Sequence, residues 1–269
     1  MKKITDAKEL RKIQLDILSY VDEICREYNI KYSIAGGTLI GAIRHRGYIP
    51  WDDDIDIMLT RENYNKLIEI LQNQHHNKNI RYKILTANTT DGYYYPFAKV
   101  VDDKTLLIEN LKGYKNFGIF IDVFPIDRID IKNSTKILFK MRLLYNMLIL
   151  KTLKISRHRF ILKNLAILLS QALLYPFSLS WIVSMMDSNA QKSSKTESSN
   201  RCCLVWGYGK REIVPYSIHE SHIDLPFEDR VFMAIKDYNT YLTNLYNDYM
   251  KLPPIEQQKS HHDFEAFWK

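Results

Sequence analysis

Residues 51–57 read Trp-Asp-Asp-Asp-Ile-Asp-Ile, so four acidic side chains stand within five positions. Because successive side chains of a strand alternate between its faces, Asp54 and Asp56 are expected to point the same way, with isoleucines opposite them. Two carboxylates this close repel each other unless a cation lies between them, and Mg²⁺ is the natural candidate because it takes hard oxygen ligands. The stretch therefore predicts a half-buried strand that carries a divalent-cation site. A solvated acidic turn is the alternative.

A glycine pair, Gly36 and Gly37, precedes this acidic stretch. We expect a short strand at 31–35, a turn at the glycines, and a helix from Thr38 to Arg44. Glycines let a phosphate approach the backbone, and the N–H groups and dipole at a helix N-terminus favour its negative charge. The turn is therefore suited to binding a phosphate.

A third acid, Asp122, lies inside the apolar run Gly-Ile-Phe-Ile-Asp-Val-Phe-Pro at 118–125. Burying a carboxylate without a partner is costly. We interpret Asp122 as a third metal ligand on the strand beside Asp54 and Asp56, where a bound cation offsets its desolvation. A hydrogen-bonded structural aspartate at a strand end is the alternative.

Helical and strand patterns alternate along the rest of the chain, which is long enough at 269 residues for a substantial core. Apolar periodicity and turn residues place the remaining elements. We expect helices at 7–28, from 61 onward and at 237–249, and strands at 80–85, 94–100 and 105–109.

Composition indicates a globular protein, with 46% hydrophobic and 26% charged residues. Three cysteines, Cys25, Cys202 and Cys203, lack the spacing of metal ligands or of a disulfide framework, which favours a reducing compartment. The first residues lack the apolar stretch of a signal peptide. We therefore expect the protein in the cytoplasm.

The net charge of +7 is concentrated in one segment, since no acid occurs between Asp130 and Asp187. We call residues 131–187 the basic annex and expect two helices in it, at 133–154 and 158–186, followed by a polar linker at 188–200. Its nine cations are Lys132, Lys136, Lys140, Arg142, Lys151, Lys154, Arg157, Arg159 and Lys163.

Large apolar residues are interleaved with these cations, a pattern typical of helices that lie on an anionic membrane surface, where each cation contributes about 1 kcal/mol. A helical subdomain whose cations face water is the alternative. No aromatic stacking pattern or recognition helix supports a nucleic-acid partner, so we expect none.

Residues 36–57 together resemble the signature of the LicD family, which is related to fukutin-type phosphotransferases of the nucleotidyltransferase superfamily. The resemblance covers about 1–128 and 203–262 and leaves the basic annex outside it. Asn247 departs from the pattern, because a glycine is expected there. Further support comes from Lys99 with Thr105, from residues 118–127, from Phe227-Glu228, and from residues 246–254.

This resemblance implies an α+β fold with a nucleotidyltransferase-like mixed sheet flanked by helices. Residues 1–130 would form the catalytic core, 131–187 the inserted basic annex, and 188–269 a C-terminal part that completes the core. The implied activity is metal-dependent transfer of a phospho-substituent from a CDP-linked donor to a sugar hydroxyl of a cell-surface glycan such as capsule, teichoic acid or lipopolysaccharide.

Phosphocholine from CDP-choline is the expected substituent, with a CDP-linked alditol phosphate as the variant. The sequence does not single out an aromatic box for choline, because packing alone brings some of its 18 tyrosines together. A nucleotidyltransferase that releases pyrophosphate and a non-catalytic membrane scaffold of glycan assembly are the alternative functions.

Site roles follow from the same resemblance. Asp54, Asp56 and Asp122 are expected to be catalytic and to hold Mg²⁺, with Mn²⁺ as the alternative metal. Asp52 and Asp53 would support these ligands or contact the acceptor. The expected location is the inner face of the cell membrane, where lipid-linked glycan acceptors are presented. The expected donor-phosphate ligands are Gly36, Gly37, Thr38, Arg44, His45, Arg46 and Lys99.

Overall fold

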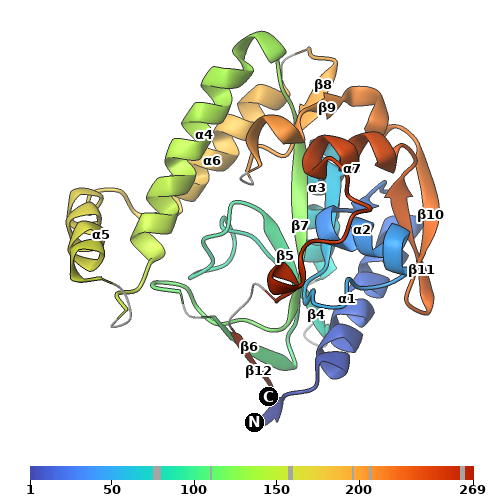
Figure 1. Ribbon diagram of the computed structural model, residues 1–269, viewed down its shortest axis with the longest axis horizontal. Coiled ribbons are helices and arrows are strands. Elements are labelled where there is room, and N and C mark those ends of the chain that lie inside the picture. Colours follow the sequence, from blue (N-terminus) through green and yellow to red (C-terminus); the bar gives the residue numbers. More distant parts are fainter. Residues whose placement is uncertain (75–79, 110, 157–159, 196, 206–207, 261–263) are drawn as a thin grey trace.

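A computed structural model describes residues 1–269 except 75–79, 110, 157–159, 196, 206–207 and 261–263 (Figure 1). Its centre is a mixed sheet in the order β2-β3-β7-β5-β4, in which only the β3–β7 pair is parallel. The α+β fold with a mixed sheet is therefore confirmed. The strands are β2 (Ser33–Ile34), β3 (Asp56–Thr60), β7 (Phe120–Arg128), β5 (Ala98–Asp102) and β4 (Tyr82–Leu85).

Three helices from the first part of the chain pack on this sheet: α1 (Ala7–Glu27), α2 (Gly36–His45) and α3 (Arg61–Gln74). The Asp6 side chain starts α1 by accepting a hydrogen bond from the Lys8 N–H at 2.9 Å. The apolar stripe expected along α1 is buried, as its 3.6-residue period requires. Its members are Leu10, Ile13, Ile17, Val21 and Ile24.

The C-terminal part completes the molecule through small sheets. β12 (Phe264–Trp268) lies between β1 (Lys2–Ile4) and β6 (Thr105–Glu109), so the two chain ends lie side by side (Figure 1). β8 (Asn200–Cys202) pairs with the end of β7 and with β9 (Val214–Pro215). The hairpin β10 (His222–Phe227) and β11 (Arg230–Ile235) precedes α7 (Tyr238–Tyr246). Short 3₁₀ turns are η1 (Gly209–Glu212), η2 (Tyr216–His219) and η3 (Ile255–Gln257).

The described residues of the basic annex form three helices, the last of which continues past Asp187, so the expectation of two was wrong. They are α4 (Ile131–Thr152), α5 (Ile161–Leu173) and α6 (Leu179–Ser194). Pro176 separates α5 from α6, and the Ser178 hydroxyl starts α6 by accepting from the Trp181 N–H at 3.0 Å. In Figure 1, α4 and α6 lie side by side, whereas α5 projects away from the central sheet. Among the described helices, none combines the length and apolar character needed to span a bilayer.

The expectation of a polar linker at 188–200 was also wrong for its first half, because α6 continues to Ser194. Its last turn docks on β7: the Ser193 hydroxyl donates to the Arg128 carbonyl at 2.7 Å, and the Ser194 hydroxyl donates to Asp127 Oδ1 at 2.7 Å. The polar residues that suggested a linker thus form hydrogen bonds with polar groups at the end of β7.

Candidate active site

The two acidic segments meet on neighbouring parallel strands. Asp56, the first residue of β3, is opposite Asp122 of β7, and the Asp122 N–H donates to the Ile55 carbonyl at 2.9 Å. Asp54 lies two residues before β3, so the strand begins later than expected. Asp54 and Asp56 nevertheless line one cavity of about 450 Å³, and the register puts Asp122 on the strand beside them.

Burial and mutual repulsion dominate the electrostatics of these acids. Desolvation, followed by the charges of Asp54, Asp122 and Asp52, raises the pKa of Asp56 well above its usual range, while Lys99 acts in the opposite direction. Lys99 is itself buried, with Nζ 2.8 Å from Asp122 Oδ1. Lys99 therefore supplies a positive charge that offsets the cost of burying Asp122. From the sequence, a bound metal was expected to supply this charge.

Lys99 supplies one positive charge against several carboxylates, and the negative charge that is left on these carboxylates is suited to a hard divalent cation. Within the described parts of the chain, Asp52, Asp53 and Asp54 each offer a carboxylate oxygen, and these oxygens lie within 4.8 Å of one another. The Ser260 hydroxyl also donates to Asp53 Oδ2 at 2.5 Å. Asp52 and Asp53, expected to support the ligands, are therefore close enough to Asp54 to act as ligands themselves.

The glycine pair opens α2 instead of forming a separate turn, and the acids lie directly against it. A Cβ atom on Gly36 would come within 3.3 Å of Asp56 Oδ2, and one on Gly37 within 2.6 Å of Asp52 Oδ2. Thr38 is buried, and its hydroxyl accepts the Asp56 N–H at 2.9 Å. These residues thus position carboxylates, and their expected contact with donor phosphates stays a prediction.

Three of the four basic residues expected to bind phosphates, Arg44, His45 and Arg46, lie at the other end of α2, about 12 Å along the helix axis from Gly36. Arg44 Nη1 donates to the Tyr249 carbonyl at 2.9 Å, and its Nε donates to His45 Nε2 at 2.9 Å. Burial and the Arg44 charge lower the pKa of His45. Arg46 is exposed and ends the helix in the left-handed region at φ +57°. In this structure Arg44 holds the segment that follows α7, and none of the three lines the cavity.

Comparison with known proteins identifies the family. Residues 29–145 match the family model described as LicD/FKTN/FKRP, nucleotidyltransferase domain. The chain is 32% identical over 276 residues to the lipopolysaccharide cholinephosphotransferase LicD of Haemophilus influenzae, and the match covers 99% of each chain. The chain belongs to the LicD family. The resemblance drawn from residues 36–57 and the assignment as a LicD-like phosphotransferase are therefore confirmed.

Two shorter matches involve uncharacterized proteins of other bacteria. One, from Rickettsia prowazekii, is 44% identical over 69 residues, which are 26% of this chain and 25% of that protein. The other, from Rickettsia typhi, is 45% identical over 60 residues, or 22% of this chain and 19% of that protein.

The C-terminal part of this LicD family member contributes cavity residues that sequence reasoning missed. Glu212 at the end of η1 is only 5% exposed, and burial raises its pKa to about 8. No sequence pattern marks Glu212, whereas Tyr246 begins the matching segment 246–254. The cavity residues from this part are Cys203, Tyr208, Glu212, Tyr241, Leu245 and Tyr246.

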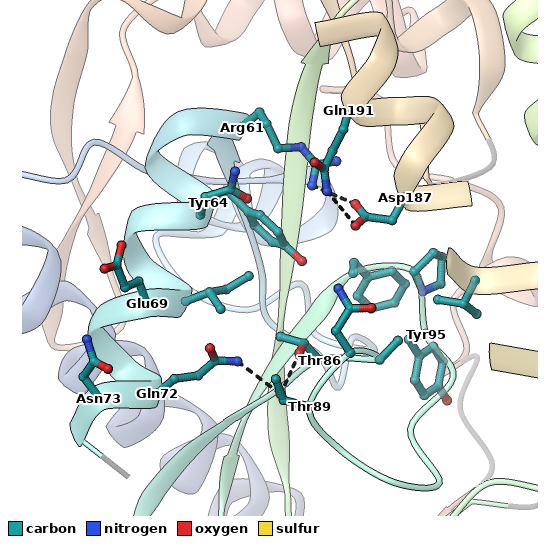
Figure 2. Close-up of a pocket in the computed structure, with 17 residues that line it drawn as sticks. Arg61, Tyr64, Glu69, Gln72, Asn73, Thr86, Thr89, Tyr95, Asp187 and Gln191 are labelled. Carbon is teal, nitrogen blue, oxygen red and sulfur yellow. Dashed lines mark hydrogen bonds and ion pairs between the residues drawn. The ribbon is translucent and has the colours of Figure 1, made fainter. Parts of the chain in front are cut away.

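A second cavity of about 370 Å³ lies between α3 and α6 (Figure 2). Asp187 at its edge is paired with Arg61, with Oδ1 2.9 Å from Nη1. The ring of Phe97, which lines this second cavity, lies 4.5 Å by centroids from that of Phe124, which lines the first. The two cavities therefore share an aromatic wall, and the clustered carboxylates belong to the first.

Proposed function

We propose that this LicD family member transfers phosphocholine from CDP-choline to a hydroxyl group of a cell-surface glycan, as in lipopolysaccharide, teichoic acid or capsule. The observation that carries the proposal is that Asp54 and Asp56 line one cavity and that Asp56 pairs with Asp122 on the neighbouring parallel strand. The lipopolysaccharide cholinephosphotransferase of Haemophilus influenzae, which matches over the full length of this chain, supports the choice of phosphocholine.

The residues of the cavity support a divalent cation, Mg²⁺ or alternatively Mn²⁺, as the cofactor. Burial, and then repulsion from the surrounding carboxylates, raise the pKa of Asp56, and Lys99 acts in the opposite direction. Asp54, Asp56 and Asp122 would hold the metal, with Asp52 at the same cavity. When bound, the metal would offset charge on the pyrophosphate and the leaving CMP and acidify the acceptor hydroxyl.

The chain's own groups would orient the reaction. Asp122 would accept the proton of the acceptor hydroxyl, and the ion pair with Lys99 would hold it in position. The first turn of α2 would offer its N–H groups to a donor phosphate, since these groups have no intrahelical partner. In this reaction the whole phospho-substituent is transferred and CMP is the leaving group. In nucleotidyl transfer the nucleotide itself is transferred, and pyrophosphate leaves.

The reaction is tested with purified protein, CDP-choline, Mg²⁺ and a glycan acceptor. Release of CMP is expected, and release of pyrophosphate from CTP would instead identify a nucleotidyltransferase. Asp56→Asn and Asp122→Asn should each lower kcat by at least about a hundredfold, because a ligand or the proton acceptor is lost. Asp91→Asn is the matched control, since Asp91 is 83% exposed and lies outside the cavity.

Full activity in both site variants would contradict the proposed roles of these acids. If the wild-type chain itself released no nucleotide product, the non-catalytic scaffold would be the better interpretation.

We further propose that the basic annex places the enzyme on the inner face of the cell membrane, where the acceptor is lipid-linked. The support is α5, which has large apolar side chains exposed to solvent next to a segment without acids. Arg157 and Arg159, two of the annex cations, lie outside the described residues. The exposed apolar residues include Phe160, Ile161, Leu162, Leu165, Leu169, Leu173 and Tyr175.

Lys140 and Lys151 of the annex have partners within the chain. Lys140 Nζ donates to Asn189 Oδ1 at 2.8 Å, and Lys151 Nζ donates to the Leu174 carbonyl at 2.8 Å. Reversing their charge would disturb the helix packing. Lys136 and Lys163 are exposed and are therefore the better sites for a charge test.

Sedimentation with phosphatidylglycerol vesicles tests the membrane proposal. Replacing both Leu162 and Leu169 with Gln should weaken binding at least about tenfold, because each buried leucine contributes about 1.5–3 kcal/mol. Lys136→Glu with Lys163→Glu should weaken binding in low salt. Ile255→Gln is the matched control, since Ile255 is 84% exposed in η3, outside the annex. Unchanged binding in both double variants would refute the membrane contact.

A further inference from the structure

We propose that Glu212, Tyr208 and Tyr246 form the subsite that recognises the quaternary ammonium group of choline. The inference rests on the proposed function and deepens it, because it assigns part of the cavity to one end of the donor. All three residues line the cavity that also contains Asp54 and Asp56. They come from η1, the segment before it, and α7, which are remote from the acidic motif in sequence.

Tyr246 connects the acids to this subsite. Its hydroxyl lies 3.5 Å from the position that a Cβ atom on Gly36 would take, and Asp56 Oδ2 lies 3.3 Å from the same position. The rings of Tyr208 and Tyr246 meet edge to face, with centroids 6.0 Å apart and an interplanar angle of 72°. A group attached to a phosphate near Asp56 would therefore meet these rings next.

Glu212 is held at the cavity by the backbone on both sides of it. Asn244 of α7 donates through Nδ2 to the carbonyls of Arg211 and Ile213, each at 2.8 Å. Glu212 is only 5% exposed and lines the cavity, and among the described residues none contributes a hydrogen bond to its carboxyl group. A buried acid without a partner is costly, so its presence at a cavity indicates a ligand that compensates it.

A quaternary ammonium group is the compensating ligand that this wall fits. It carries a fixed positive charge and no N–H donor, so it is bound by aromatic rings and a nearby carboxylate instead of by hydrogen bonds. Burial raises the pKa of Glu212 to about 8, and an adjacent fixed cation would favour its charged form. An alditol chain brings hydroxyl groups and no charge, so the subsite selects choline over ribitol or glycerol.

Competition between two donors tests this subsite. CDP-choline is compared with its neutral isostere, the CDP ester of 3,3-dimethylbutanol, in which carbon replaces the ammonium nitrogen. Wild-type protein should prefer CDP-choline in kcat/KM, and Glu212→Gln should reduce the preference at least about tenfold. Tyr208→Leu should reduce it as well, by loss of a ring. Glu220→Gln, an exposed acid beyond η2, is the matched control and should keep the wild-type preference.

Folding of the variants is checked by thermal unfolding. Glu212→Gln removes a buried carboxyl, so its midpoint should equal or exceed that of the wild type, which separates lost recognition from lost structure. If wild type turns over CDP-choline but the preference persists in Glu212→Gln and in Tyr208→Leu, the subsite is refuted while the proposed function stands. If wild type turns over CDP-ribitol and not CDP-choline, both the choline donor and the subsite are refuted.

Discussion

Gly37 and Gly41 of α2 have different neighbours. The difference indicates that glycine is needed at Gly41 for packing and at Gly37 for the position of an acidic side chain. A Cβ atom on Gly41 would lie 2.3 Å from the Gly47 carbonyl oxygen, which is backbone that cannot move freely. A Cβ atom on Gly37 would instead lie 2.6 Å from Asp52 Oδ2, the end of a side chain that can rotate away. The LicD signature thus contains one glycine for close packing and one for the placement of an acid.

We predict opposite outcomes for alanine at these two positions. Gly41→Ala should lower the free energy of unfolding by about 1–3 kcal/mol, because the backbone must shift to admit the methyl group. Gly37→Ala should leave unfolding by urea nearly unchanged, since alanine favours the helix. It should weaken Mg²⁺ binding in calorimetry, because Asp52 is displaced from the cavity. Equal stability of the two variants would contradict this distinction.

At the scale of the elements, Arg61 joins α3, β7 and α6. Its guanidinium makes two hydrogen bonds with Asp127, at 2.7 and 2.8 Å, and one with Asp187 at 2.9 Å. Asp127 is fully buried, whereas the Asp187 side chain is 25% exposed. The basic annex is therefore held to the central sheet by an ion-pair network that is buried at Asp127 and partly exposed at Asp187. Figure 2 shows the contact between Arg61 and Asp187.

This asymmetry predicts unequal costs for removing the charges. Arg61→Met should lower the free energy of unfolding by about 3–5 kcal/mol, because it leaves the buried Asp127 without its partner. Asp187→Asn is the matched comparison and should cost under about 1 kcal/mol, since water can solvate that end of the network. Urea unfolding of both variants measures the difference. Similar losses would show that the two contacts contribute equally.

The elements differ in how far sequence could predict them. The helix at 7–28 and the strand at 105–109 were confirmed within a residue, because their apolar periods are regular. The acids were expected on adjacent strands, and the parallel register now pairs Asp56 with Asp122. The break in the second annex helix was missed because the apolar pattern continues across Pro176, although a proline there favours a helix end.

For the whole molecule, the least predictable features were those that depend on distant contacts. The ion pair of Lys99 with Asp122 follows from strand register, and the buried position of Glu212 follows from the docking of η1 on α7. No local sequence pattern marks Lys99 or Glu212, because each would be an ordinary surface charge if the chain packed differently. Tertiary packing therefore adds the groups that set the charge balance of the cavity.

Two buried titratable groups should shape the pH dependence of stability for the whole fold. Burial, then Arg201 and His222, lower the pKa of His219 to about 3 from 6.5, so only the unfolded chain takes up this proton between those values. Burial raises the pKa of Glu212 to about 8 from 4.5, so only the folded chain holds that proton between those values. The His219 contribution is therefore lost as pH falls below 6.5, and the Glu212 contribution as pH rises above 4.5.

Each group should contribute a slope of about 1.4 kcal/mol per pH unit within its own window, and the two slopes should nearly cancel between pH 4.5 and 6.5. Relative to wild type, His219→Gln should gain stability as pH falls from 6.5 towards 4, because it removes the neutral histidine that acid must charge. Glu212→Gln should gain stability as pH rises from 5 to 8, because its amide has no proton to lose. Urea unfolding at half-unit pH steps measures both differences, and a pH-independent difference for either variant would show that the side chain titrates alike in the folded and unfolded states.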